Sequence, residues 1–200
     1  MIEILLGIAL FTGLVLILTA IILACLLGLA QAAEFSAKVV SHMGPQKVQG
    51  KVYLKGEKMR QEFSMGGGKS INIARPDKNV MWVLMPAQKF YVEMPFKETD
   101  LAKTMRMPKD KTKMKLVGTE TVNGYQTDKY ETVVKSDGKT MTFYLWVAKK
   151  LGVPIKMVSK DGSYSMEYQD IKEGNVPDSK FEVPSGYRKM PMPQGMPRGR

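Results

Sequence analysis

Apolar and polar residues alternate along most of the chain after its first 32 residues, with the period of two that is typical of β-strands. In KMRQEFSM (residues 58–65), Met59 and Phe63 share one face, and charged and polar side chains share the other. The stretch NVMWVLMP (residues 79–86) is apolar in both phases, which indicates a strand that is covered on both faces.

Turn dipeptides separate these alternating runs. Asn123-Gly124, Asp137-Gly138 and Asp161-Gly162 supply the positive φ angles that two-residue hairpins need. Strands joined by such hairpins are antiparallel. We therefore predict a mostly β fold in which about ten or eleven strands follow one another as a meander. A helix is predicted over residues 96–107, FKETDLAKTMRM, where acidic residues come early and basic residues late.

The N-terminal segment is apolar almost throughout residues 4–30. It ends in small residues, and Ala30 and Ala32 fit a signal-peptidase site before Ala33. The segment also exceeds the ~20 apolar residues that a membrane anchor needs. A lipoprotein signal with Cys25 as the lipidated residue is the third interpretation. We expect cleavage and delivery to the periplasm. Lysines follow the segment and none precede it, and positively charged flanks tend to stay in the cytoplasm. A retained inner-membrane anchor with the domain on the periplasmic side is therefore disfavoured.

The composition limits the kinds of partner and of chemical site that the chain can offer. The formal net charge is +11, which favours anionic partners such as a membrane surface, whereas no nucleic-acid-binding motif accompanies the charge. The one cysteine lies in the apolar segment and the one histidine is His42, so the remainder of the chain offers no disulfide and no thiol-based zinc site. We therefore expect no cofactor and no enzymatic activity, since the residues of an active site do not converge.

Two short motifs suggest other chemistry. MGGGKSI (residues 65–71) looks like the end of a phosphate-binding loop, but Phe63 occupies the position of the first glycine and a strand pattern follows. We therefore predict a hairpin tip. The second motif lies in the C-terminal tail, where the thioethers of Met190, Met192 and Met196 could bind Cu(I). Copper handling is thus a minor alternative function.

Three ordered segments carry a resemblance to a known family. They are VQGKVYLKGEKMRQEF, ARPDKNVMWVLMPAQKFYVEMP and KFEVPSGYRKM, which begin at residues 48, 74 and 180. In this order they resemble the lipoprotein-carrier superfamily typified by LolA and LolB, in particular a branch with an uncharacterised periplasmic domain. The resemblance implies a curved antiparallel sheet, an unclosed half barrel, with one or a few helices on its concave face.

The apolar first segment, the resemblance and the composition of the tail together predict a domain organisation, and the resemblance implies a function. We expect residues 1–32 to be a signal peptide or membrane anchor, residues 33–188 the half-barrel domain, and residues 189–200 a flexible tail rich in Met, Pro and Gly. The function implied is that of a periplasmic carrier or sensor, which binds lipid or acylated lipoprotein in an apolar cavity, as in the sorting of outer-membrane lipoproteins. The alternative is a structural or protein-binding envelope domain without a ligand, and the oligomeric state is open.

The predicted cavity combines apolar residues from several strands. Its candidate lining residues are Leu54, Met59, Phe63, Ile71, Ile73, Trp82, Leu84, Phe90, Val92, Phe143 and Leu145. Lys58 and Arg60 are expected at the rim, where their charges could meet lipid headgroups.

Overall fold

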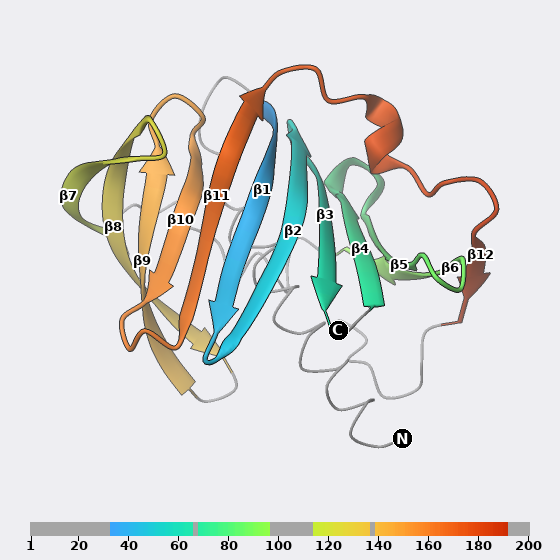
Figure 1. The fold of residues 1–200 in the computed structure, drawn as a ribbon, viewed down its shortest axis with the longest axis horizontal. Coiled ribbons are helices and arrows are strands. Elements are labelled where there is room, and N and C mark those ends of the chain that lie inside the picture. The colour runs from blue at the N-terminus through green and yellow to red at the C-terminus, as the bar shows by residue number, and fades with distance from the viewer. Residues whose placement is uncertain (1–32, 66–67, 97–113, 137–138, 192–200) are drawn as a thin grey trace.

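The computed structural model describes residues 33–65, 68–96, 114–136 and 139–191. Most of them belong to β-strands (Figure 1). The strands are β1 (Glu34–Met43), β2 (Gln46–Lys55), β3 (Lys58–Met65), β4 (Gly68–Arg75), β5 (Val80–Met85), β6 (Phe90–Pro95), β7 (Met114–Val122), β8 (Tyr125–Ser136), β9 (Lys139–Ala148), β10 (Val153–Ser159), β11 (Tyr164–Glu173) and β12 (Arg188–Met190). The described helices are the short 3-10 turns η1 (Pro76–Lys78) and η3 (Asp178–Phe181).

All described strands join one sheet, in the order β12-β6-β5-β4-β3-β2-β1-β11-β10-β9-β8-β7. Neighbours are antiparallel except for β12, which runs parallel to β6. The predicted mostly β, curved and unclosed antiparallel sheet is therefore confirmed, with twelve strands in place of the ten or eleven expected. Residues 97–107 of the predicted helix lie outside the described residues, as do the N-terminal segment and residues 192–200.

Turn chemistry explains the meander. Asn123 and Gly124 have φ angles of 48° and 80° and connect β7 to β8, as the sequence predicts. Met65 of β3 pairs with Gly68 of β4 in an antiparallel ladder. The motif MGGGKSI therefore joins two strands, which confirms the hairpin prediction and excludes the helix that a phosphate-binding loop requires.

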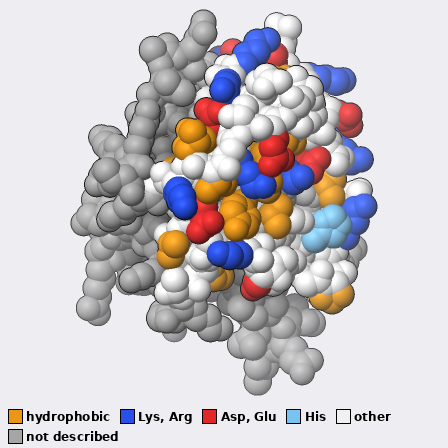
Figure 2. Space-filling view, turned by 90° about the vertical axis from the view of Figure 1, so that its left-hand side faces the viewer, with side chains coloured by type: hydrophobic (Ala, Val, Ile, Leu, Met, Phe, Trp, Pro, Cys, Tyr) orange, Lys and Arg blue, Asp and Glu red, His pale blue; other side chains and the backbone are white. Residues whose placement is uncertain are grey.

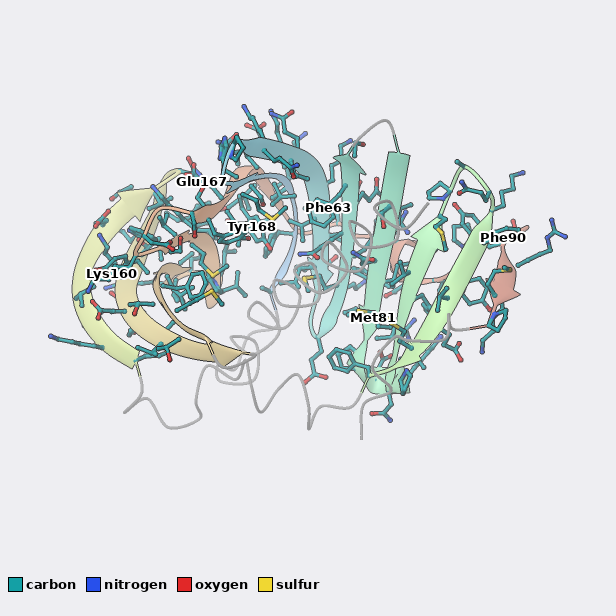
Figure 3. The ribbon with its side chains drawn as sticks, turned by 90° about the horizontal axis from the view of Figure 1, so that it is seen from below. Phe63, Met81, Phe90, Lys160, Glu167 and Tyr168 are labelled. Atoms are coloured by element: carbon teal, nitrogen blue, oxygen red, sulfur yellow. The ribbon has the colours of Figure 1, made fainter. Side chains whose placement is uncertain are left out.

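The sheet curves into an arch with an inner and an outer face, best seen along the strands (Figure 3). Side-chain alternation assigns the faces: Leu54, Met59 and Ala74 are cross-strand neighbours and lie on the inner face. Ile73 precedes Ala74 on β4 and therefore lies on the outer face, directly opposite Trp82. Among the described residues, no helix is long and apolar enough to span a membrane.

Each face carries its own hydrophobic cluster. The main core cluster includes inner-face side chains of β1, β2, β3, β9, β10 and β11. A second, outer cluster consists of buried residues of β4 and β5 together with Val176 and Phe181 of the segment that follows β11. Residues 174–187, called the C-terminal segment below, thus cover the outer face of β4 and β5. This explains why these strands are apolar in both phases.

Candidate functional site

The centre of the inner face is completely buried. Leu54 and Met59 have no exposed surface, and Phe63 is 3% exposed. On the neighbouring strands, the rings of Phe35 and Tyr168 lie 6.1 Å apart at their centroids. Alternation along β11 places Tyr168 inside the arch and Glu167 outside it, as the labelled residues of Figure 3 show.

The inner face continues across β9, β10 and β11. Leu145 pairs with Met157, and Met157 pairs with Met166, so that one apolar row crosses three strands. Phe143 extends this surface and packs edge-on against Tyr164, with ring centroids 6.3 Å apart. Because methionine side chains are flexible and polarisable, a surface with several of them can adapt to different apolar groups.

Toward β7 the inner face reaches the surface of the molecule. Tyr130 pairs with Leu145 on one side and with Leu116 on the other, so all three side chains lie on the inner face. Leu145 is buried, Tyr130 is half-buried and Leu116 is 56% exposed. Met114 and Met141 are also half-buried there. Figure 2 views the molecule from the β7 side and shows the outer surface there, with the one histidine in sight and hydrophobic side chains among charged ones. We call Met114, Leu116, Tyr130 and Met141 the β7–β9 margin.

The structure divides the predicted lining residues between the two faces. Leu54, Met59, Phe63, Phe143 and Leu145 belong to the main core cluster. Ile71, Ile73, Trp82 and Leu84 belong to the outer cluster with Val176 and Phe181, so the prediction that they line the same cavity is wrong. The reason is that β4 and β5 are apolar in both phases, and alternation cannot tell which phase faces inward.

The remaining two predicted lining residues lie on β6. Val92 is buried and pairs with Val83, and Phe90 pairs with Met85. Phe90 is half-buried, and the guanidinium carbon of Arg188 on β12 lies 5.4 Å from its ring centroid. These two residues therefore lie at the β12 end of the sheet, across the arch from the β7–β9 margin (Figure 1).

The predicted rim charges have a different role. Arg60 is 8% exposed and donates hydrogen bonds to Glu62 Oε1 at 2.8 Å and to the main-chain oxygen of Lys180 at 3.1 Å. Lys58 donates to Asp178 at 3.1 Å. Both residues hold the C-terminal segment on the outer face, so they do not line the rim of an inner cavity. Arg60 is in phase with Ile73, its cross-strand neighbour on β4, and so belongs to the outer face.

Arg75 makes a second anchor that the sequence interpretation missed. It donates to Asp77 at 2.8 Å and 2.6 Å, to the main-chain oxygen of Phe181 at 3.1 Å, and to Glu182. The hydrogen bonds from Arg75 lower the pKa of Asp77. Burial would raise the pKa of Glu182, but hydrogen bonds from Lys78 and Arg75 outweigh it and lower that pKa. The carboxylates are thus held in their charged form around Arg75.

A sequence-family model matches most of the chain that forms this sheet. The family model described as "Domain of unknown function (DUF4412)" matches residues 37–153 and 150–187. The chain belongs to the DUF4412 family. No curated protein sequence matches it significantly.

Solved structures show where else this DUF4412 fold occurs. An uncharacterized conserved protein from Thermus thermophilus superposes with a TM-score of 0.58 at 15% identity, over 80% of this chain and 91% of the other. MucB in complex with MucA(peri) gives a TM-score of 0.50 at 12% identity, over 84% of this chain and 59% of MucB. The MucA/MucB complex of Pseudomonas aeruginosa gives 0.50 at 14% identity, over 82% and 59%. The chain thus spans about three fifths of MucB, and these identities show the fold alone.

The DUF4412 domain also carries isolated polar groups whose chemistry can be assigned. His42 is exposed, and its Nδ1 lies 3.3 Å from the Ser165 hydroxyl. No group of three or more His, Cys, Asp or Glu side chains with the geometry of a metal site occurs among the described residues. Met190 is 40% exposed on β12, whereas Met192 and Met196 of the predicted copper motif lie outside the described part of the chain.

Proposed function

We propose that this DUF4412 domain is a non-enzymatic carrier or sensor of the cell envelope, exported across the inner membrane, which holds the acyl chain of a lipid or lipoprotein against the inner face of its sheet. The observation that carries the proposal is the continuity of that face. It runs from the buried centre at Leu54 and Met59 through Leu145 to the exposed Leu116. This is also the function that the resemblance to LolA and LolB implies.

The physical basis is burial of apolar area. Each methylene group that leaves water contributes ~0.8 kcal/mol, so an acyl chain is held by contact area without directional bonds. An open sheet suits such a ligand because the β7–β9 margin can contact a chain while its headgroup remains in water. The half-buried Met114 and Met141 at this margin can adapt to chains of different length.

The polar groups of the domain support a non-enzymatic role. Arg60, Arg75, Glu62, Asp77 and Glu182 are all engaged in ion pairs, and the pair of Arg75 with Glu182 holds the C-terminal segment. Carboxylates whose pKa is lowered in this way stay ionised at neutral pH, and they are poorly matched to general acid–base catalysis, which works best with a pKa near the working pH.

A matched pair of substitutions tests the proposal. Leu116 and Val133 are 56% and 54% exposed, but Leu116 lies on the inner face and Val133 on the outer. Both can take a charge with little effect on stability because both face solvent. Binding would be measured by displacement of a fluorescent fatty acid and by native mass spectrometry of protein from an envelope fraction. We expect Leu116→Glu to weaken acyl binding about tenfold, because an acyl contact of this size is worth about 1.5 kcal/mol.

The control decides the interpretation. Val133→Glu introduces the same charge and should leave the affinity for the fatty acid unchanged. If both variants bind as the unmodified protein does, or if no acyl ligand binds or co-purifies, the proposal is wrong.

A second function, binding of a partner polypeptide, is favoured by one observation. β7 is at an edge of the described sheet and exposes Val117 (41%) at a bulge next to Leu116. An edge of this kind can accept an additional strand from another chain. The complex of MucB with MucA(peri) shows that a protein of this fold binds a partner. A bound peptide in the native mass spectrum, without lipid, would favour this function.

A further inference from the structure

The outer face carries a hollow that the acyl-binding proposal does not use. Its volume is about 600 Å³, within the range of small-ligand sites. It lies over the adjoining strands β11, β1, β2, β3 and β4, which Figure 1 shows side by side. The residues that line it are Ser36, Ala37, Lys38, Gln49, Gly50, Lys51, Tyr53, Glu62, Ser64, Lys69, Asp170 and Lys172. We call this hollow the outer groove.

Positive charge is in excess in the outer groove. Four lysines, Lys38, Lys51, Lys69 and Lys172, line it together with two acids. One of the acids, Glu62, is already engaged by Arg60 at 2.8 Å and by Lys69 at 3.4 Å. Within the described ranges, no ion pair involves the other three lysines. Among the described residues, the groove thus holds three lysines without an ion pair. Lys51 is directly opposite Glu62 in the ladder, but Arg60 and Lys69 already engage that carboxylate.

The arrangement of two of these lysines is unfavourable by itself. Lys38 of β1 is directly opposite Lys51 of β2 in the antiparallel ladder. Side chains in this relationship have Cβ atoms about 5 Å apart, and like charges there destabilise the sheet. An anion that contacts both ammonium groups would remove the repulsion.

The same sheet shows how such a pair is neutralised elsewhere. Lys55 of β2 is directly opposite Lys58 of β3. There Asp178 of the C-terminal segment lies between them, with its two carboxylate oxygens 3.3 Å from Lys55 Nζ and 3.1 Å from Lys58 Nζ. The chain therefore supplies an oxyanion for one lysine pair on the outer face, while the Lys38–Lys51 pair opens onto a hollow.

We propose that the outer groove binds a phosphate group, which either a lipid headgroup or a soluble phosphate ester could carry. One carboxylate satisfies two lysines, as Asp178 does, whereas a phosphate has the charge and the oxygen atoms to contact three. The hydroxyl groups of Ser36 and Ser64 and the amide of Gln49 line the groove as further donors. Lysine suits this task because its ammonium group binds phosphate as a point charge.

The phosphate site and the acyl site are on opposite faces of the sheet. Lys51 lies on the outer face and Val52, the next residue, lies buried on the inner face. The two proposals therefore rest on different residues, and either can fail without the other. Leu116→Glu should leave phosphate binding unchanged.

Calorimetric titration tests the site with inorganic phosphate and glycerol phosphate as soluble probes. Sedimentation with phosphatidylcholine vesicles, with and without phosphatidylglycerol, tests the headgroup. The groove variant is Lys38→Gln with Lys51→Gln. The control variant is Lys115→Gln with Lys160→Gln, which removes the same charge at two exposed positions outside the groove. We expect the groove variant to bind at least about tenfold more weakly, and the control to bind as the unmodified protein does.

The outcomes separate the two sources of phosphate. Binding of the soluble probes that the groove variant loses supports a soluble ester. Binding only to the vesicles that contain phosphatidylglycerol, again lost in the groove variant alone, supports a lipid headgroup. An equal loss in both variants would show attraction by net charge only and would overturn the proposal, as would the absence of binding to every probe.

Discussion

Arg75 on β4 reaches across to the C-terminal segment and donates a 3.1 Å hydrogen bond to the main-chain oxygen of Phe181. The Phe181 side chain is fully buried against Ile73 and its neighbours in the outer cluster. A main-chain carbonyl that enters an apolar site needs a donor, since an unpaired buried acceptor costs about 1–3 kcal/mol. Arg75 provides that donor, and its own charge is balanced by Asp77 and Glu182.

The first prediction concerns this anchor. Arg75→Ala should lower the free energy of unfolding by about 2 kcal/mol, because it leaves the Phe181 oxygen and Asp77 without this donor and leaves Glu182 with Lys78 alone. Urea denaturation followed by circular dichroism would measure the loss. Lys78→Ala is the matched control, since Lys78 also contacts Glu182 but is 44% exposed, and exposed ion pairs contribute little. Equal losses in the two variants would contradict the role given to Arg75.

The second prediction concerns how the free energy of unfolding changes at acid pH, which depends on the carboxylates around Arg75. Asp77 and Glu182 have pKa values below their usual 3.8 and 4.5. The unfolded chain therefore binds more protons than the native state at acid pH. The stability that these carboxylates contribute is fully present above pH 4.5 and is lost as the pH falls through the lowered pKa values.

The variant Glu182→Gln tests this acid dependence. Its stability should be lower than that of the unmodified domain at neutral pH, and it should fall less steeply below pH 4.5. Chemical denaturation at a series of pH values would show both effects. An unchanged acid slope in this variant would mean that Glu182 has the same pKa in the folded and unfolded chain.

Much of the sheet could be predicted from the sequence because its signals are local. Asn123-Gly124 and the alternation in residues 58–65 depend only on adjacent residues. The face of β4 and β5 could not be assigned in this way, since Ile73 and Ala74 are both apolar and both buried. What decides it is the packing of Phe181 onto Ile73, a contact between segments more than a hundred residues apart.

The arginine anchors did leave a signal in the sequence. Arg60 and Arg75 each have an acid two residues later, Glu62 and Asp77. Residues two apart in an extended strand lie on the same side, and Arg60 contacts Glu62 on β3. Asp77 lies in the 3-10 turn η1 that directly follows β4, where it contacts Arg75. The Lys38–Lys51 pair left no such signal, because it depends on the register of the hairpin between β1 and β2.

A third prediction uses two glycines that lie in strands. A Cβ at Gly50 would lie 2.0 Å from the main-chain oxygen of Glu62 and 2.9 Å from Phe63 Cδ1, whereas a Cβ at Gly118 would meet nothing within 4 Å. Gly50→Ala should therefore destabilise the domain by about 1–3 kcal/mol, because β2 must move away from β3. Gly118→Ala should be neutral or stabilise it by up to about 1 kcal/mol. Thermal unfolding of both variants gives the comparison, and similar melting temperatures would refute the close approach at Gly50.

A fourth prediction concerns the free energy of unfolding at alkaline pH. It depends on Tyr164, whose ring packs against Phe143 on the inner face. Burial raises the pKa of Tyr164, and the neighbouring Ser41 hydroxyl opposes the rise only in part. Above pH 10, the usual pKa of tyrosine, the unfolded chain loses this proton while the native state keeps it. The free energy of unfolding should therefore fall as the pH rises, with this one residue contributing up to about 1.4 kcal/mol per pH unit.

Tyr164→Phe isolates that contribution. At neutral pH the variant should stay within about 1 kcal/mol of the unmodified domain, because the ring and its contacts remain and a single buried hydroxyl is removed. Between pH 10 and the alkaline limit of folding, its stability should decline less steeply than that of the unmodified domain. Denaturant titrations across this range measure both slopes. Parallel slopes would show that Tyr164 ionises in the native state, and with it that this part of the inner face is open to water.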